Sequence, residues 1–172
     1  MATQGRIKKG LIERLKGHSK DFQLSKYLPV ESIAFIDVKS SDEAIRSLVD
    51  RLYRNGIIHE RALFTQSLQA REALGSTAIG DGIAIPHARI AAFDEFFVAV
   101  GIVHHDGLNW DDQHSGIHFI FLIGGPDNRP NEYLQIISHL TTAVKDEEKR
   151  AKLLSCQTPK DVHRYLLSVS KG

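Results

Sequence analysis

One histidine in this sequence of 172 residues has neighbours suited to chemistry on a phosphoryl group. His87 follows Pro86 and precedes Ala88, whose small side chain would leave room for another molecule to approach the imidazole. Histidine is the side chain that can act as a neutral nucleophile near pH 7. Arg71 and Arg89 lie on either side of it in the sequence, and their planar guanidinium groups match phosphate oxygens. The pattern favours a histidine that accepts a phosphoryl group.

The segment before His87 predicts how the imidazole is presented. Residues 82–86 form a short apolar run. Pro86 fixes its own φ and holds Ile85 in an extended conformation. We therefore expect a short buried strand over residues 82–86 that stops abruptly and delivers His87 at its end.

Helix and glycine signals before this strand place the other groups. A helix is expected over residues 59–73, which puts Arg71 in the last turn, where the helix dipole favours a cation. Arg71 therefore has two possible roles, as a phosphate-binding group or as a cap of its own helix. Gly80 and Gly82 are expected to let backbone N–H groups approach the phosphoryl group closely.

The remaining segments predict helices on both sides of a sheet. Ser40 and Glu43 form a capping box in front of an amphipathic helix that ends at Asn55-Gly56. Further strands are expected over residues 32–38, 96–104 and 118–123, and further helices over 22–28, 131–144, 147–155 and after Thr158-Pro159. We therefore expect an α/β protein, a three-layer α/β/α sandwich with a mixed, roughly four-stranded sheet.

Composition is that of an ordinary globular protein. Hydrophobic residues make up 42% of the chain and charged residues 25%, so a real core is expected. The net charge of +1 gives no overall argument for nucleic acid binding. The single cysteine, Cys156, cannot form an internal disulfide, no secretory signal is visible, and the longest apolar run, residues 96–103, is too short to span a bilayer. These features predict a cytoplasmic protein without membrane insertion.

The first twenty residues differ from the rest in charge. Residues 1–20 contain six lysines and arginines and one glutamate, so they are strongly basic. Ile7, Leu11 and Leu15 recur every four residues. We expect a basic N-terminal extension over residues 1–20, flexible or in a short helix, followed by one domain over residues 21–172.

The stretch that ends at His87 resembles a known family. It is similar to the IIA domain of the fructose–mannitol class (type 2) of the bacterial phosphoenolpyruvate:sugar phosphotransferase system, and most of all to the stand-alone nitrogen-regulatory, PtsN-like branch. The residues that carry the resemblance are Arg71-Glu72, Ser76-Thr77, Ile79-Gly80 and Gly82-Ile83-Ala84-Ile85-Pro86-His87, with weaker support from Gln23-Leu24-Ser25, Gly107-Leu108-Asn109-Trp110 and Leu153-Leu154.

The resemblance implies a phosphohistidine phosphocarrier. His87 would accept a phosphoryl group from an HPr-type or NPr-type carrier, with Arg71 as the active-site arginine and Ser76 and Thr77 in the loop facing the histidine. Arg89 is a second candidate for phosphate binding. No cofactor and no metal are implied. The family usually has a second histidine beside the phosphoryl site, and by register that position is Tyr133 here.

Three functional classes stay open at this point. A regulatory protein would bind protein partners according to its phosphorylation state, whereas a transport component would pass phosphate to a sugar-specific IIB domain. The chain shows no fused IIB or membrane segment, which favours the regulatory class. The remote alternative is a metal-dependent hydrolase, with ligands drawn from His104, His105, Asp106, His114 and His118.

Overall fold

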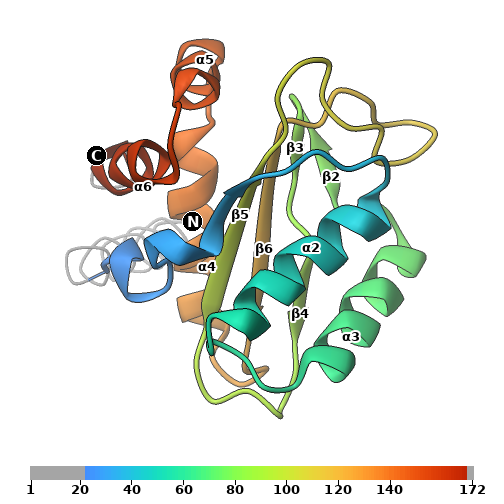
Figure 1. Cartoon of the computed structure of the whole chain (residues 1–172). Helices are drawn as coiled ribbons and strands as arrows, with labels where there is room; N and C mark the ends of the chain where they lie inside the picture. Colours follow the sequence, from blue (N-terminus) through green and yellow to red (C-terminus); the bar gives the residue numbers. More distant parts are fainter. Residues whose placement is uncertain (1–21, 170–172) are drawn as a thin grey trace, which may run out of the picture.

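Helices lie on both sides of a central sheet in the computed structural model, which describes residues 22–169 (Figure 1). The basic extension expected over residues 1–20 lies outside the described residues. The helices are two short 3-10 helices, η1 (Leu24–Lys26) and η2 (Val30–Ser32), and then α2 (Ser41–Arg54), α3 (Arg61–Leu74), α4 (Pro130–Ala143), α5 (Glu147–Ser155) and α6 (Pro159–Val169). The strands are β1 (Ile33–Phe35), β2 (Ala78–Gly80), β3 (Ile83–Ala84), β4 (His87–Arg89), β5 (Phe97–Ile102) and β6 (Phe119–Gly125).

The strands form one mixed sheet in the order β1-β5-β6-β3-β2, with β4 also paired to β6. β5 and β6 run antiparallel, β1 runs parallel to β5, and β3 and β4 run parallel to β6. The mixed sheet is as expected, but it has six strands rather than about four. The strand expected over residues 82–86 is shorter, and a new strand begins at His87, because Pro86 has no N–H to donate to a ladder. β2 is not among the expected strands.

A tight turn connects β2 to β3. Asp81 and Gly82 are its two central residues, with φ angles of 54° and 77°, and Gly80 before them has a φ of 99°. Two central residues with positive φ give the turn whose twist matches a β-hairpin, and Asp-Gly is a preferred pair there. Gly80 and Gly82 therefore have a conformational role in this hairpin. The close approach of their N–H groups to a phosphoryl group stays a prediction.

The two faces of the sheet are covered by different helices. Side chains of β5 alternate, so that Val98 and Val100 pack with α4 and α6 while Phe97 and Ala99 pack with α2 and α3. Figure 1 shows the same division, with α2 and α3 on one side of the sheet and α4, α5 and α6 on the other. The three-layer α/β/α sandwich is confirmed.

Two predicted helix starts are confirmed by their hydrogen bonds. The Ser40 hydroxyl accepts a hydrogen bond from the Glu43 backbone N–H (3.1 Å), and the Glu43 carboxylate accepts one from the N–H of Lys39 (3.0 Å). At α6, the Thr158 hydroxyl accepts a bond from the Asp161 N–H (3.2 Å). Side-chain oxygens of this kind satisfy backbone donors that the first turn leaves unpaired.

Candidate phosphoryl-acceptor site

His87 is the first residue of β4, which pairs with the end of β6. Residues two apart on a strand share a face, so His87 and Arg89 both point toward α4, where each lies against the ring of Tyr133. Ala88 points the other way and is buried in the core beneath α2 and α3. The expectation that Ala88 opens space beside the imidazole is therefore wrong, because the alternation of the strand sends its side chain to the opposite face.

The hydrogen bonding of His87 determines which ring nitrogen is available. Its Nδ1 lies 2.8 Å from the backbone carbonyl oxygen of Ile85. A carbonyl oxygen only accepts hydrogen bonds, so Nδ1 carries the proton and donates it. In the neutral ring, Nε2 then keeps its lone pair. The geometry thus presents Nε2 as the nucleophilic nitrogen.

The surroundings of His87 keep the ring neutral. The pKa of His87 is lowered from its ordinary value of 6.5, chiefly by burial and also by the positive charges of Arg71 and Arg89. The Ile85 carbonyl and the Glu72 carboxylate act in the opposite direction. Since the net shift is downward, the nucleophilic neutral form predominates at pH 7.

Replacing Arg89 with glutamine is expected to raise the pKa of His87. The exchange removes a positive charge that disfavours the imidazolium form, and glutamine preserves most of the side-chain length. An NMR titration of the His87 ring protons would measure the shift. Arg164→Gln, an exposed arginine on α6, is the matched control. An unchanged or lower pKa for His87 in Arg89→Gln would contradict the electrostatic role of Arg89.

Arg71 lies in the last turn of α3, as expected, and its side chain caps that helix. One guanidinium nitrogen, Nη1, donates a hydrogen bond to the carbonyl oxygen of Gly75 (2.7 Å). In residues 22–169 neither Arg71 nor Arg89 forms an ion pair with a carboxylate. Arg71 thus shows the capping contact foreseen as an alternative, and its charge still reaches His87.

Tyr133, on α4, contacts both the imidazole of His87 and the guanidinium of Arg89. Its ring centroid is 5.9 Å from that of His87, and the Cζ atom of Arg89 is 4.4 Å from it on a cation–π contact. Burial raises the pKa of Tyr133, while the charges of Arg89 and Arg71 lower it by a smaller amount. The phenol therefore stays protonated at neutral pH and has an O–H to donate.

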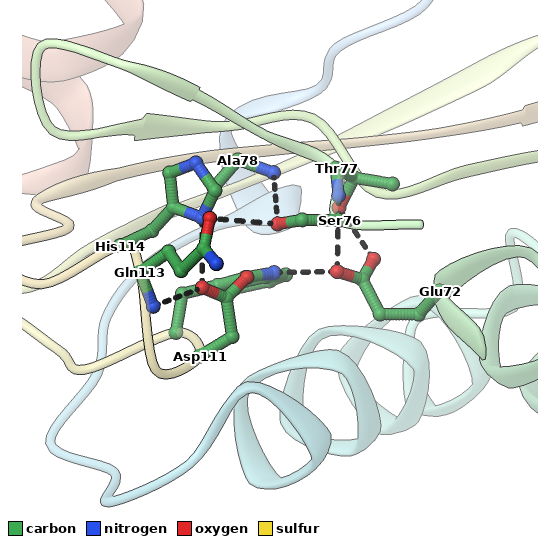
Figure 2. Close-up of polar contacts among 8 residues, drawn as sticks. Glu72, Ser76, Thr77, Ala78, Asp111, Gln113 and His114 are labelled. Carbon is green, nitrogen blue, oxygen red and sulfur yellow. Dashed lines mark hydrogen bonds and ion pairs between the residues drawn. The ribbon is translucent and has the colours of Figure 1, made fainter. Parts of the chain in front are cut away.

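The two residues expected in the facing loop have different partners. Thr77 is only 4% exposed, and both its N–H (3.0 Å) and its hydroxyl (2.5 Å) donate to the carboxylate of Glu72 (Figure 2). Ser76 is exposed, and its hydroxyl accepts a bond from the Ala78 N–H (3.1 Å). Neither hydroxyl bonds to His87 among the described contacts. The group that holds Thr77 is the Glu72 carboxylate, for which the sequence predicts no specific role.

A serine, a histidine and an aspartate meet near this loop, but they do not form a catalytic relay. The Nδ1 atom of His114 lies 2.7 Å from the Asp111 carboxylate and 3.5 Å from the Ser76 hydroxyl (Figure 2). A relay needs the two ring nitrogens to face different partners, and here both contacts fall on one nitrogen. Hydrogen bonds lower the pKa of Asp111 to about 2. The Ser76 hydroxyl contributes most, and His114 and the Gln113 N–H contribute less.

The histidines of the hydrolase alternative do not converge. His104 lies against the ring of Phe35, His118 bonds through Nδ1 to the carbonyl oxygen of Val103 (2.7 Å), and His114 faces Asp111. Within residues 22–169 no group of three or more histidine, cysteine, aspartate or glutamate side chains is placed to hold one metal ion. The geometry of these side chains gives the hydrolase alternative no support.

The fold is an α/β/α sandwich, and the charges of Arg71 and Arg89 both act on the imidazole of His87. The chain belongs to the family described as "Phosphoenolpyruvate-dependent sugar phosphotransferase system, EIIA 2", whose model matches residues 26–169. The resemblance to the type-2 IIA domain seen in the sequence is confirmed.

Relatives of two kinds are similar to this chain. The 2-O-alpha-mannosyl-D-glycerate-specific EIIABC component of Escherichia coli is 34% identical over 126 residues, which cover 72% of this chain but only 19% of that protein. The fructose-specific EIIA component of Haloferax volcanii is 29% identical over 150 residues, covering 85% and 96% of the two chains. The nitrogen regulatory protein of Bradyrhizobium diazoefficiens is 25% identical over 140 residues, covering 80% and 90%.

The structural comparison agrees with the family. The crystal structure of nitrogen regulatory protein IIA-Ntr from Neisseria meningitidis superimposes with a TM-score of 0.74 at 26% identity, covering 83% of this chain and 98% of that one. No helix within residues 22–169 is long and apolar enough to cross a membrane. The relatives include both sugar-specific and regulatory proteins, and the family match does not choose between them.

Proposed function

We propose that the chain is a phosphohistidine phosphocarrier that accepts a phosphoryl group on Nε2 of His87 from an HPr-type or NPr-type carrier protein. The observation that carries the proposal is the bond from Nδ1 to the Ile85 carbonyl, which leaves Nε2 as the unprotonated nitrogen. The proposed donor chain begins with phosphoenolpyruvate, which is a cytoplasmic metabolite, so the proposal implies a cytoplasmic location.

The proposed transfer needs no metal, because the donor already carries an activated group. Nε2 forms the new N–P bond while the N–P bond to the donor imidazole breaks, and the departing electron pair remains on the donor ring. The His87 ring gains positive charge in this step, and the Ile85 carbonyl oxygen stabilises it through the Nδ1 proton. The phosphoryl oxygens carry the negative charge and need cationic groups nearby.

Three groups around His87 are suited to bind those oxygens. Arg71 and Arg89 have no carboxylate partner in the described part of the chain, so their charge is not neutralised locally. The Tyr133 hydroxyl stays protonated and has no hydrogen-bond partner among residues 22–169, so it has a proton to donate. Guanidinium forks and a phenol O–H are suitable donors to a phosphoryl group.

The proposed role is regulatory rather than sugar transport. The similarity to nitrogen regulatory proteins supports it, as does Tyr133, which takes the place of an expected histidine. A neutral phenol steadies a bound phosphoryl group but does not match an imidazolium in offsetting charge during onward transfer. We infer a phosphorylated form that persists and is recognised by a protein partner through its added negative charge.

Replacing Tyr133 with histidine is expected to shorten the lifetime of the phosphorylated form. A charge-assisted hydrogen bond from an imidazolium is stronger than a neutral one from a phenol. We expect this difference to speed transfer of the phosphoryl group back to the unphosphorylated carrier about 10-fold. The rate of loss of the phosphoryl group in the presence of that carrier measures this. Tyr133→Phe is the control, since it keeps the ring under Arg89 but removes the hydroxyl. An equal lifetime in Tyr133→His and the wild-type chain would contradict the role given to Tyr133.

The regulatory role is tested by comparing what the two phosphorylation states bind. Pull-downs with the phosphorylated chain and with His87→Ala are expected to recover different sets of proteins. The competing role is that of a IIA component in fructose or mannitol uptake, which the similarity to fructose-specific EIIABC and EIIA components and to a mannitol-specific EIICBA component favours. Identical sets from both baits, together with rapid transfer of the group to a sugar-specific IIB domain, would establish that competing role instead.

A further inference from the structure

The carboxylate of Glu72 collects three hydrogen bonds from two segments that are far apart in the sequence. Oε1 accepts from the Thr77 N–H (3.0 Å) and from the indole Nε1–H of Trp110 (2.7 Å), and Oε2 accepts from the Thr77 hydroxyl (2.5 Å). Figure 2 shows the two bonds between Glu72 and Thr77 at the end of α3. Thr77 and Trp110 are each 4% exposed, so water does not compete freely for these donors. The carboxylate therefore fixes Thr77 firmly against the helix end.

Thr77 is in turn linked to His87 through the backbone of one residue. The Thr77 carbonyl oxygen accepts a hydrogen bond from the Ile85 N–H (2.9 Å). The carbonyl oxygen of Ile85 in turn accepts a hydrogen bond from Nδ1 of His87 (2.8 Å). The position of the Ile85 peptide thus depends on Thr77 on one side and sets the imidazole on the other.

We propose that Glu72 is a positioning residue for His87, acting through Thr77 and the backbone of Ile85 to hold the imidazole with its proton on Nδ1 and its lone pair on Nε2. The bonds from Glu72 to Thr77, from Thr77 to Ile85 and from Ile85 to His87 form a continuous chain. The kinetic part of this inference rests on the proposed phosphocarrier function, whereas the part about the ring proton does not.

The negative charge of Glu72 also acts on the proposed phosphoryl site. Glu72 lies close enough to His87 to favour the charged form of the imidazole, and a carboxylate at that distance would also repel an incoming phosphoryl group. Its three donors offset that charge and hold both oxygens in fixed directions. A carboxylate with both oxygens occupied positions Thr77 without becoming a free acceptor inside the phosphoryl site.

Glu72→Gln is the direct test, because it keeps the shape of the side chain. One carboxylate oxygen becomes an NH2 group, which cannot accept from Thr77 or Trp110. We expect phosphoryl transfer to slow by roughly 10- to 100-fold, as for a reacting group that is slightly misplaced, with the KM for the carrier unchanged. The nitrogen-15 NMR shifts of the His87 ring are expected to change from one tautomer to a mixture of both. Glu60→Gln, an exposed residue at the start of α3, is the control and should match the wild-type chain.

A second pair of variants covers the case in which Glu72→Gln does not fold. Thr77→Val removes the hydroxyl that donates to Glu72 and keeps the shape, while Thr77→Ser keeps the hydroxyl. We expect Thr77→Val to show a slower transfer and a mixed His87 tautomer, and Thr77→Ser to restore most of both. A merely structural role would lower thermal stability in Thr77→Val without changing the ring nitrogens.

The outcomes separate this inference from the proposed function. A wild-type tautomer and transfer rate in folded Glu72→Gln or Thr77→Val would overturn the positioning role. A wild-type chain that accepts no phosphoryl group would refute the proposed function, and the tautomer measurement would still decide the role of Glu72. A mixed tautomer with slowed transfer in Glu72→Gln, and neither change in Glu60→Gln, supports the inference.

Discussion

Replacing His87 with alanine is expected to abolish phosphorylation of the chain by phosphoenolpyruvate, the general first enzyme of the system and an HPr-type carrier. The substitution removes Nε2, the nucleophile of the proposed site, and leaves the arginines in place. Wild-type chain should gain one phosphoryl group that is labile in acid and stable in base. Mass spectrometry of the intact protein, recorded before and after incubation, measures both results.

Two further variants make the His87 test specific. His87→Gln retains a polar side chain of similar size on β4, so it separates loss of the nucleophile from any disturbance of the strand. His59→Ala removes an exposed histidine just before α3 and should be phosphorylated like the wild-type chain. Phosphorylation of His87→Ala to the wild-type extent would show that another residue accepts the group.

Replacing Arg71 with alanine is expected to slow phosphoryl transfer by about 10- to 100-fold, since a charge-assisted hydrogen bond is worth roughly 1.5–3 kcal/mol. The charge of Arg71 reaches His87, and no carboxylate pairs with it among the described residues. Single-turnover transfer from the phosphorylated carrier gives the rate. Arg71→Lys keeps the charge but loses the planar fork, so an intermediate rate is expected.

Arg71 also caps α3 through Gly75, so its effect on folding must be measured separately. Because that hydrogen bond is exposed to solvent, its loss is expected to cost only about 0.5–1.5 kcal/mol of unfolding free energy. Denaturant unfolding of Arg71→Ala determines this cost, and transfer is then compared under conditions where both chains are folded. If Arg71→Ala is folded and transfers at the wild-type rate, Arg71 is only a helix cap.

The layers of the fold were predictable because the signals for them are local. Apolar periodicity and capping residues such as Ser40 and Thr158 predict the helices within a few residues. The number of strands was not predicted correctly. The hairpin of β2 and β3 had a signal, Asp81-Gly82 between apolar residues, which identifies a two-residue turn. The break between β3 and β4 lies at Pro86, where the sequence pattern predicts the end of a strand rather than an interruption between two strands.

The site was predictable only in part, for reasons of distance along the chain. His87 and Arg89 share a face because they lie two apart on β4, and this follows from the alternation of any strand. The contact between Glu72 and Trp110 joins residues 38 positions apart, and no local pattern predicts such a pairing. The backbone bond from His87 to Ile85 likewise depends on where the strand breaks. The sequence therefore predicts which groups react in the proposed transfer, but not which groups orient them.

Phosphorus-31 and nitrogen-15 NMR of the phosphorylated wild-type chain tests the central claim most directly. The coupling between phosphorus and a ring nitrogen identifies both the residue and the atom that carry the phosphoryl group. The geometry predicts a single phosphohistidine at His87 with phosphorus on Nε2, because Nδ1 is committed to the Ile85 carbonyl. A phosphoryl group on Nδ1 of His87, or on any other residue, would contradict the account.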